Sequence, residues 1–199
     1  MVASKLLAAA LFREHNWVQS FPAFGVERRG APVTAFMRVD RDPIRLRCEV
    51  TEPDDIIVLD PTLIEAVDVT AGLKSGGAIL INSSKPASSY ASLASKYRVI
   101  TVDASEIALR HGLGSRTQPI VNTAILGAFA AITGMVGLES VCAVIREDVP
   151  MQPDANEAAA REAAEAVVAA EGAGPVAGVG NGADGGSGAA ASGSEVTHA

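Results

Sequence analysis

Three continuous apolar runs recur along the middle of the chain, and polar residues follow each of them. The runs cover residues 56–59, 78–81 and 99–102. Apolar runs of this length without alternation are typical of strands that are buried on both faces. Helical patterns lie between or after the runs, at residues 62–73, 88–96 and 104–111. Strand–helix alternation of this kind predicts right-handed crossovers and a parallel sheet.

The first 50 residues follow a different pattern. Residues 3–14 carry apolar side chains at helical spacing, and residues 17–21 form a short extended run. Residues 33–40 and 44–50 alternate between apolar and polar side chains and are separated by a turn around Pro43. Alternation predicts half-buried strands, so we expect an antiparallel pair joined as a hairpin.

The last third of the chain is helical and then low in complexity. Helical patterns cover residues 119–133, 138–146 and 154–171, whereas residues 172–199 are mostly Gly, Ala and Ser. Such a tail buries too little apolar area to offset its ordering entropy. We therefore predict an α/β domain over residues 1–150, a C-terminal helix packing on it over 151–171, and a disordered tail over 172–199.

Two apolar stretches raise the question of a membrane. Residues 1–12 resemble a short signal peptide, but charged residues follow directly and no cleavage site of small residues is present. Residues 120–138 contain Asn122, Thr123 and three glycines, which favours a buried core helix over a membrane span. The formal net charge of −7 also argues against anionic membranes and nucleic acid as partners. We expect a cytoplasmic protein.

The sequence offers no familiar catalytic or metal-binding motif. Cys48 and Cys142 lie far apart, so this chain alone is not expected to hold a zinc ion or an iron–sulfur cluster. The three histidines, His15, His111 and His198, have no nucleophile in a recognisable motif beside them. We predict surface or capping roles for them, and neither a catalytic residue nor a metal site in this chain.

Polar residues that follow the predicted strands mark a possible ligand-binding edge. The carboxyl ends of parallel strands meet at one edge of a sheet, where open α/β sheets bind ligands. We therefore expect a ligand edge that includes Asn82, Ser83, Ser84 and, at the start of a later helix, Asn122, with Asp60 and Asp103 beside them.

A second candidate site is a glycine-hinged loop between the first two extended segments. Its candidate residues are Ser20, Gly25, Glu27, Arg28, Arg29 and Gly30. Adjacent guanidinium groups can form bidentate hydrogen bonds with phosphate or carboxylate. The alternative is an ordinary solvated loop in which Glu27 pairs with an arginine, a contact that contributes little stability.

This loop carries a resemblance to a known family. The run Ser20-Phe21-Pro22, then Phe24-Gly25 and Glu27-Arg28-Arg29-Gly30-Ala31-Pro32-Val33, resembles the gamma subunits of pyruvate:ferredoxin oxidoreductases, within the 2-oxoacid:acceptor oxidoreductase family. Segments 77–82 and 122–128 are similar to two further stretches of that family, and the likeness extends over about residues 2–170. The Glu-Arg-Arg-Gly-Ala-Pro pattern is more similar to the pyruvate branch than to relatives that act on 2-oxoglutarate or indolepyruvate.

The resemblance implies a role inside a multi-chain enzyme. It implies oxidative decarboxylation of pyruvate, transfer of the acyl group to coenzyme A, and passage of two electrons to ferredoxin. Thiamine diphosphate, Mg²⁺ and iron–sulfur clusters would be held by alpha, beta and ferredoxin-like delta subunits, and none of them by this chain alone. The gamma subunit would be a Rossmann-like α/β domain, with a mostly parallel sheet, that assists assembly and lies on the coenzyme A side. Arg28 and Arg29 would contact coenzyme A phosphates or a neighbouring subunit.

One departure from the family concerns the N-terminus. The family begins with a strand and a turn of the form Gly-x-Gly-Gly-Gln-Gly, whereas this sequence begins at Met1 inside the helix that follows. We interpret this as a start codon assigned too late, or as a homologue that lacks its first strand. Intact-mass measurement of the native protein tests the first possibility.

Three rival interpretations stay open at this stage. The same subunit role could serve another 2-oxoacid, such as 2-oxoisovalerate, 2-oxoglutarate, indolepyruvate or phenylglyoxylate. The chain could instead be a stand-alone α/β module that binds a nucleotide-like ligand. It could also be a non-functional fragment. Copurification with a thiamine enzyme separates the first interpretation from the other two.

Overall fold

The computed structural model describes residues 2–23, 33–172 and 192–198. The helices are α1 (Val2–Arg13), α2 (Leu63–Ala66), the 3-10 helix η1 (Ala87–Tyr90), α3 (Ala91–Ala94), α4 (Ala104–Arg110), α5 (Asn122–Thr133), α6 (Leu138–Asp148) and α7 (Pro153–Gly172). The strands are β1 (Trp17–Pro22), β2 (Val33–Asp40), β3 (Asp55–Val58), β4 (Ala78–Asn82), β5 (Arg98–Val102), β6 (Gly114–Ser115), β7 (Gln118–Pro119) and β8 (Ser192–His198).

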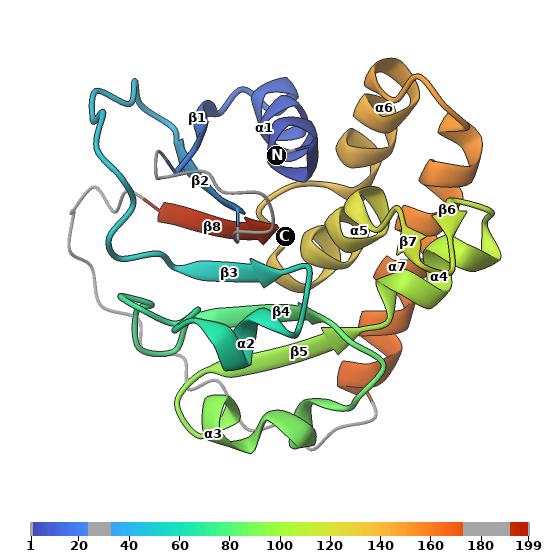
Figure 1. Cartoon of the computed structure of the whole chain (residues 1–199). Coiled ribbons are helices and arrows are strands. Elements are labelled where there is room, and N and C mark those ends of the chain that lie inside the picture. Colours follow the sequence, from blue (N-terminus) through green and yellow to red (C-terminus); the bar gives the residue numbers. More distant parts are fainter. Residues whose placement is uncertain (1, 24–32, 173–191, 199) are drawn as a thin grey trace.

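Six of these strands form one sheet in the order β1-β2-β8-β3-β4-β5 (Figure 1). Strands β3, β4 and β5 are parallel, as the three apolar runs predict, and β8 is parallel to β3. Strand β2 is antiparallel to both β1 and β8. The fold is therefore α/β, with a parallel half and an antiparallel half in a single sheet.

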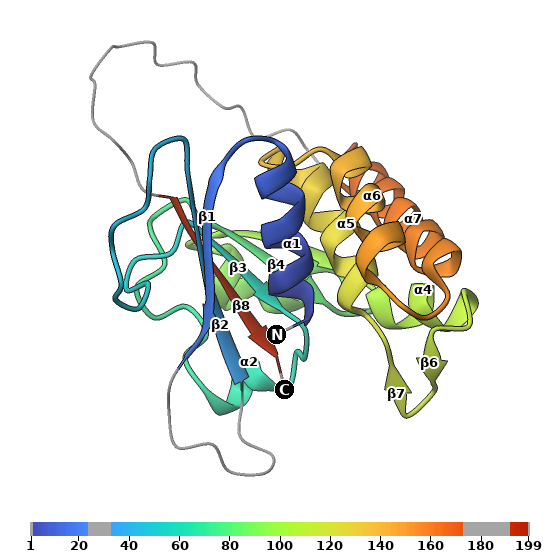
Figure 2. The same cartoon turned by 90° about the horizontal axis from the view of Figure 1, so that it is seen from above.

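Successive side chains of the strands pack into two separate hydrophobic cores, one on each face of the sheet. In β3, Ile57 packs toward α1 and α5, whereas Ile56 and Val58 pack toward α2 on the other face. Figure 2 shows α1, α5, α6 and α7 gathered on one side of the sheet. The sheet is covered on both faces there, which explains why the strand sequences are continuously apolar rather than alternating.

Helix α5 is the buried core helix that its composition predicts. Nine of its residues are buried, and it lies against α7, α6 and α1. The backbones of α5 and α7 approach closely at Gly127, where the absence of a Cβ leaves room for the carbonyl of Ala160. The buried Thr123 hydroxyl donates to Asn156 Oδ1 at 2.8 Å, so this buried polar pair between the two helices is satisfied. Among the described helices, none is both long and apolar enough to cross a membrane.

The predicted strand at residues 44–50 is wrong. This segment has no strand, and the hairpin partner of β2 is β1, with Trp17 opposite Asp40. Strand β2 is paired on both of its edges, by β1 and by β8, so residues 44–50 cannot pair with it. Instead, the buried Arg38 of β2 contacts this segment through its Nη2, which donates to the Glu49 carbonyl at 2.8 Å.

Two helices are shorter than the sequence predicts. The helix expected over 62–73 is confined to α2, because the Asp68 carboxylate accepts from the backbone N–H and hydroxyl of Thr70 at 3.0 and 2.8 Å and forms a turn there. The helix expected over 88–96 is η1 followed by α3. The other helices match their predicted positions within about two residues, except that α5 begins at Asn122, after the short strand β7.

The tail also differs in part from the sequence prediction. Residues Ser192–His198 form β8, which lies between β2 and β3 in the sheet. Residues 173–191 and 199 lie outside the described part of the chain. Disorder therefore stays a prediction for residues 173–191.

Candidate functional site

The carboxyl ends of the three parallel strands bring together polar residues from distant parts of the sequence. Asp60, Asn82 and Asp103 follow or end β3, β4 and β5, respectively. The Asp60 carboxylate accepts from the Thr62 backbone N–H at 2.9 Å. The Asp103 carboxylate accepts from the Glu106 N–H at 2.9 Å and caps α4. Both carboxylates are thus fixed by local backbone, Asp60 in a turn before α2 and Asp103 as the N-cap of α4.

The Asn82 side chain, which also lines the cavities at this edge, connects the strand ends to each other. Its Nδ2 donates to the Leu59 carbonyl at 2.9 Å and to Ser105 Oγ at 3.0 Å. Its Oδ1 accepts from the Ser105 backbone N–H at 3.2 Å. The buried amide therefore uses both of its N–H groups and one lone pair to connect β3, β4 and α4.

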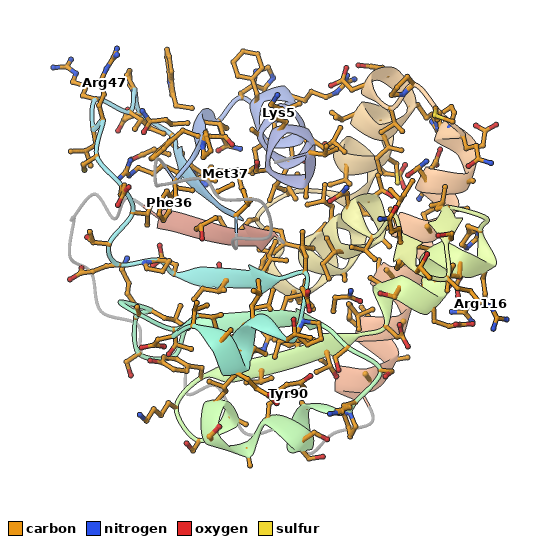
Figure 3. The ribbon with its side chains drawn as sticks, viewed as in Figure 1. Lys5, Phe36, Met37, Arg47, Tyr90 and Arg116 are labelled. Carbon is orange, nitrogen blue, oxygen red and sulfur yellow. The ribbon has the colours of Figure 1, made fainter. Side chains whose placement is uncertain are left out.

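Ser83 is a predicted edge residue that keeps a hydrogen-bond donor available. Its Oγ accepts from the Tyr90 hydroxyl at 2.9 Å and from the Lys85 backbone N–H at 3.0 Å. A hydroxyl oxygen has two lone pairs, so both are occupied and the Ser83 proton is the group left to donate. Tyr90 is the last residue of η1 (Figure 3), and its hydroxyl fixes the Ser83 hydroxyl from one side.

Ser83 and its neighbours line a cavity of about 640 Å³ between α2, η1–α3 and the strand ends. The lining includes the hydroxyl groups of Thr62, Ser83, Ser84, Ser89, Ser92 and Ser105. Its charged residues are Glu65, Lys85 and Asp103, so carboxylates outnumber ammonium groups by two to one. Ile64 and Leu93 add apolar surface. The cavity therefore suits an uncharged, hydrogen-bonding group better than a phosphate.

A second cavity of about 440 Å³ lies on the other side of Asn82. The β6–β7 hairpin forms its outer wall through Thr117, Gln118 and Pro119. Asn122, the remaining residue of the predicted ligand edge, lines a third cavity with this hairpin instead. Asn122 Oδ1 is buried and has no hydrogen-bond partner among the described residues. The structure thus brings Asn82, Ser83 and Ser84 together and places Asn122 beyond β7.

Most of the arginine-bearing loop lies outside the described part of the chain. Gly25, Glu27, Arg28, Arg29 and Gly30 lie outside the described residues, whereas Ser20 is half-buried in β1. Strand β1 runs in the same direction as β3, since β2 is antiparallel to β1 and to β8, and β8 is parallel to β3. Pro22 at the end of β1 therefore lies at the carboxyl edge of the sheet, the edge that carries the cavities.

Sequence reasoning missed three residues of this edge. Tyr90 and Lys85 are held against Ser83 by bonds that span seven and two residues, and Ser105 reaches Asn82 across 23 residues. A serine two residues after Asp103, at the start of α4, was the available signal. Elsewhere, His111 pairs with Glu162 at 2.6 Å between α4 and α7, which is a packing contact. The described residues contain no cluster of His, Cys, Asp or Glu that could hold a metal ion.

Comparison with known proteins assigns the family. The family model described as pyruvate ferredoxin/flavodoxin oxidoreductase matches residues 1–166. The chain is 51% identical over 149 residues to the pyruvate/ketoisovalerate oxidoreductases common subunit gamma of Thermococcus kodakarensis, covering 74% of this chain and 78% of the relative. It is 46% identical to the pyruvate synthase subunit PorC of Methanothermobacter marburgensis, covering 83% and 89%.

A solved structure agrees with this result. The crystal structure of pyruvate oxidoreductase subunit PORC from Thermotoga maritima superposes with a TM-score of 0.68 at 32% identity, covering 82% of this chain and 87% of that one. The family model matches residues 1–166, a range that includes the parallel strands β3–β5, the residues of the carboxyl edge, and α5–α6. This chain is a gamma subunit of the pyruvate ferredoxin/flavodoxin oxidoreductase family.

Proposed function

We propose that this gamma subunit works in a complex with alpha, beta and ferredoxin-like delta subunits that oxidises pyruvate. The complex converts pyruvate and coenzyme A to acetyl-CoA and CO₂, and it passes two electrons to ferredoxin. The observation that carries this proposal is the 46–51% identity to chains named as subunits of pyruvate-oxidising enzymes. The relatives are matched over more than three quarters of their own length, which supports an equivalent role for the whole chain.

Reconstitution tests the proposed role directly. The alpha, beta and delta subunits encoded with this chain are coexpressed with and without it, and pyruvate- and coenzyme A-dependent reduction of ferredoxin is measured. We expect activity only when this chain is present, and none from this chain alone. Full activity of the other subunits without it contradicts the proposal.

The cysteines of this chain do not fit the iron–sulfur clusters of such a complex. Cys48 and Cys142 are its two cysteines, so it cannot supply the four thiolates that an iron–sulfur cluster takes. Cys48 is exposed and lies beside Arg38, whereas Cys142 is buried in α6. We assign thiamine diphosphate, Mg²⁺ and the clusters to the partner subunits.

Coenzyme A is the co-substrate that the carboxyl edge suits. Its phosphates need cations, and the cavity around Ser83 offers one ammonium group against two carboxylates. We therefore assign the phosphates to Arg28 and Arg29, whose loop follows the end of β1 at this edge. The hydroxyl-lined cavity takes an uncharged part of the ligand, with the Ser83 proton as a donor to one of its amide carbonyls.

Replacing both arginines separates ligand binding from assembly. In the reconstituted complex, Arg28→Ala/Arg29→Ala should raise the KM for coenzyme A at least about tenfold, because two charge-assisted contacts are lost. The matched control is Arg41→Ala/Arg45→Ala, two exposed arginines in the segment after β2. If the KM is unchanged and the complex dissociates, the loop is an assembly element.

A second substrate is favoured by one specific observation. The relative from Thermococcus kodakarensis is named as a common subunit of pyruvate and ketoisovalerate oxidoreductases, so the same gamma chain serves two enzymes there. We propose that substrate choice lies on the partner subunits and that this chain can serve a 2-oxoisovalerate enzyme as well. Assembly with each set of alpha and beta subunits tests this. Activity that follows the gamma chain, rather than its partners, contradicts it.

Two other roles predict different behaviour. A stand-alone module for a nucleotide-like ligand binds coenzyme A as a monomer with full affinity. Another 2-oxoacid, such as 2-oxoglutarate, indolepyruvate or phenylglyoxylate, replaces pyruvate as the preferred substrate of the purified complex. Isothermal titration of the isolated chain and a substrate panel on the complex distinguish these outcomes.

A further inference from the structure

The cavities at the carboxyl edge form a continuous row. The cavity around Ser83 and the cavity between Asn82 and the β6–β7 hairpin are both lined by Pro61, Asn82 and Ser105. The latter cavity and the cavity beside Asn122 are both lined by Gln118, Pro119 and Val121. We call this row the carboxyl-edge groove, and it extends from Tyr90 in η1 to Asn122 in α5. A long ligand can therefore contact the strand ends and α5 at the same time.

The groove loses charge toward α5. The charged residues at its Ser83 end are Glu65, Lys85 and Asp103. At its α5 end none of the described lining residues is charged, and Ile120, whose side chain is 48% exposed, supplies apolar surface. This end therefore suits a segment of a ligand that is uncharged and partly apolar.

The β6–β7 hairpin forms a fixed wall of the groove. Figure 2 shows the hairpin projecting from the body of the domain beside α4. Ser115 Oγ accepts from the Gln118 N–H at 3.2 Å and lies 3.1 Å from Thr117 Oγ1. The Ile120 N–H donates to the Leu113 carbonyl at 3.1 Å. These bonds hold the turn and the base of the hairpin, so the wall is preformed.

Asn122, the first residue of α5, carries an unused hydrogen-bond acceptor at this end of the groove. Its Oδ1 is buried and has no hydrogen-bond partner among the described residues, and no side chain caps this helix. Buried polar groups are almost always paired, so an unpaired acceptor beside a cavity points to a donor from outside the chain. The residue as a whole is partly exposed, and rotation about its soft amide torsion brings Oδ1 to the cavity wall.

We propose that Asn122 is a binding residue for the amide-bearing arm of coenzyme A, which lies along the carboxyl-edge groove and donates an amide N–H to Asn122 Oδ1. This inference deepens the proposed function and rests on it. The arm contains two secondary amides separated by methylene groups, so it supplies both the donor and the apolar surface that the α5 end of the groove calls for. Ser83 and Asn122 are complementary, because Ser83 donates to an amide carbonyl and Asn122 accepts from an amide N–H.

A comparison of two nucleotides on one variant tests the contact. In the reconstituted complex, Asn122→Ala should raise the KM for coenzyme A about three- to tenfold at unchanged kcat, because one neutral hydrogen bond is lost. Adenosine 3′-phosphate 5′-diphosphate, which lacks the arm, should compete with coenzyme A equally well in the variant and the wild type. An unchanged KM, or equal weakening of both nucleotides, overturns the proposal.

A conservative variant and a matched control sharpen the result. Asn122→Asp keeps an acceptor of the same shape at the N-terminal end of α5, where the helix dipole favours its charge, so its KM should stay within about threefold of the wild type. An Asp variant as weak as the Ala variant overturns the proposal. Asn16→Ala is the same substitution at the start of β1, where the side chain donates to the Leu11 carbonyl, and it should leave the KM unchanged.

Stability and assembly separate binding from a structural role. In the isolated chain, Asn122→Ala should not lower the urea midpoint, because no printed bond of the wild-type side chain is lost within the described chain. A lower midpoint makes Asn122 a structural residue and overturns the proposal. Dissociation of the variant complex with an unchanged KM assigns Oδ1 to the backbone of a partner subunit and also overturns it. A wild-type complex that does not use coenzyme A overturns the proposed function as well, whereas an unchanged KM in an active complex leaves that function standing.

Discussion

A Cβ atom on Gly127 of α5 would lie 1.9 Å from the carbonyl oxygen of Ala160 on α7. No side-chain rotation relieves this contact, because the neighbour is backbone within a helix. The two helices therefore pack so closely that position 127 has room for a hydrogen atom but not for a methyl group. Since α5 lies across the core, this contact sets where α7 lies on the domain.

Gly127→Ala should force α5 and α7 apart. Overpacking of this severity costs about 3 kcal/mol, of which the better helix propensity of alanine returns about 1 kcal/mol. We expect a net loss of about 2 kcal/mol in the free energy of unfolding, measured with urea. Gly137→Ala is the control, because its nearest contact is the flexible Glu14 carboxylate at 3.0 Å. A stabilised Gly127→Ala variant would show that the helices can separate without cost.

The hydrogen bonds of Asn82 to Leu59 and Ser105 lead to a second prediction. Asn82→Ala removes hydrogen bonds to Leu59, to Ser105 Oγ and to the Ser105 N–H, of which the first two are 2.9 and 3.0 Å long. Unpaired buried groups remain, so we expect a loss of about 2–3 kcal/mol in unfolding free energy. The exposed neighbour Ser84→Ala should change stability by less than about 0.5 kcal/mol. An Asn82→Ala protein of unchanged stability with weakened coenzyme A binding would instead make Asn82 a ligand residue.

The contrast between Asn82 and its strand shows what the sequence can predict. The apolar run 78–81 identifies a buried strand from composition alone, because burial on both faces leaves few other choices. The polar residue at its end was equally visible, but its role was not. That role depends on Ser105, which is 23 residues away and reaches Asn82 only through the parallel pairing of β4 and β5.

Two of the local errors arise from contacts that a local sequence pattern does not contain. Residues 44–50 alternate like a strand, and residues 62–73 are rich enough in apolar residues for a helix. Both edges of β2 are already paired and Arg38 bonds the Glu49 carbonyl, whereas Asp68 forms a turn with Thr70. Hydrophobic periodicity is judged over a window of several residues, so it does not reveal a single side chain that forms a hydrogen bond with the backbone.

Asp55 at the start of β3 makes a prediction about pH. Burial raises the pKa of its carboxyl, nearby Asp54 adds to this effect, and the Ala78 N–H and Arg98 oppose it. The folded state thus holds this proton at a higher pH than the unfolded state does. The ionised carboxylate therefore destabilises the fold above its folded pKa, and this penalty vanishes below the unfolded value of 3.8.

Asp55→Asn removes the charge and keeps an oxygen that can accept from Ala78. We expect the variant to be more stable than the wild type at pH 7, and the difference to close as the pH falls toward 4. Urea unfolding at a series of pH values measures both. Glu65→Gln serves as the control, because the Glu65 side chain is exposed. A difference that stays constant down to pH 3.5 would assign the effect to packing rather than to charge.

The Tyr90 hydroxyl makes the last prediction, which concerns the cavity. Tyr90→Phe keeps the ring packed against the core cluster that includes Leu63 and Ile81. It removes the hydroxyl that donates to Ser83 Oγ at 2.9 Å. We expect a loss of about 1 kcal/mol in unfolding free energy. In the complex, the freed Ser83 hydroxyl no longer presents its proton in one direction, so the KM for coenzyme A should rise about three- to tenfold while kcat stays the same.

The split between KM and kcat is the decisive part of this experiment, because a merely structural tyrosine would lower the yield of active complex and hence the apparent kcat. Tyr97→Phe is the matched control, since Tyr97 also packs against the α2-side core but does not line the cavity around Ser83. Ser83→Ala should reproduce the rise in KM, as both variants remove the same oriented proton. If Tyr90→Phe and Ser83→Ala bind coenzyme A like the wild type, the uncharged part of the ligand lies elsewhere on the carboxyl edge.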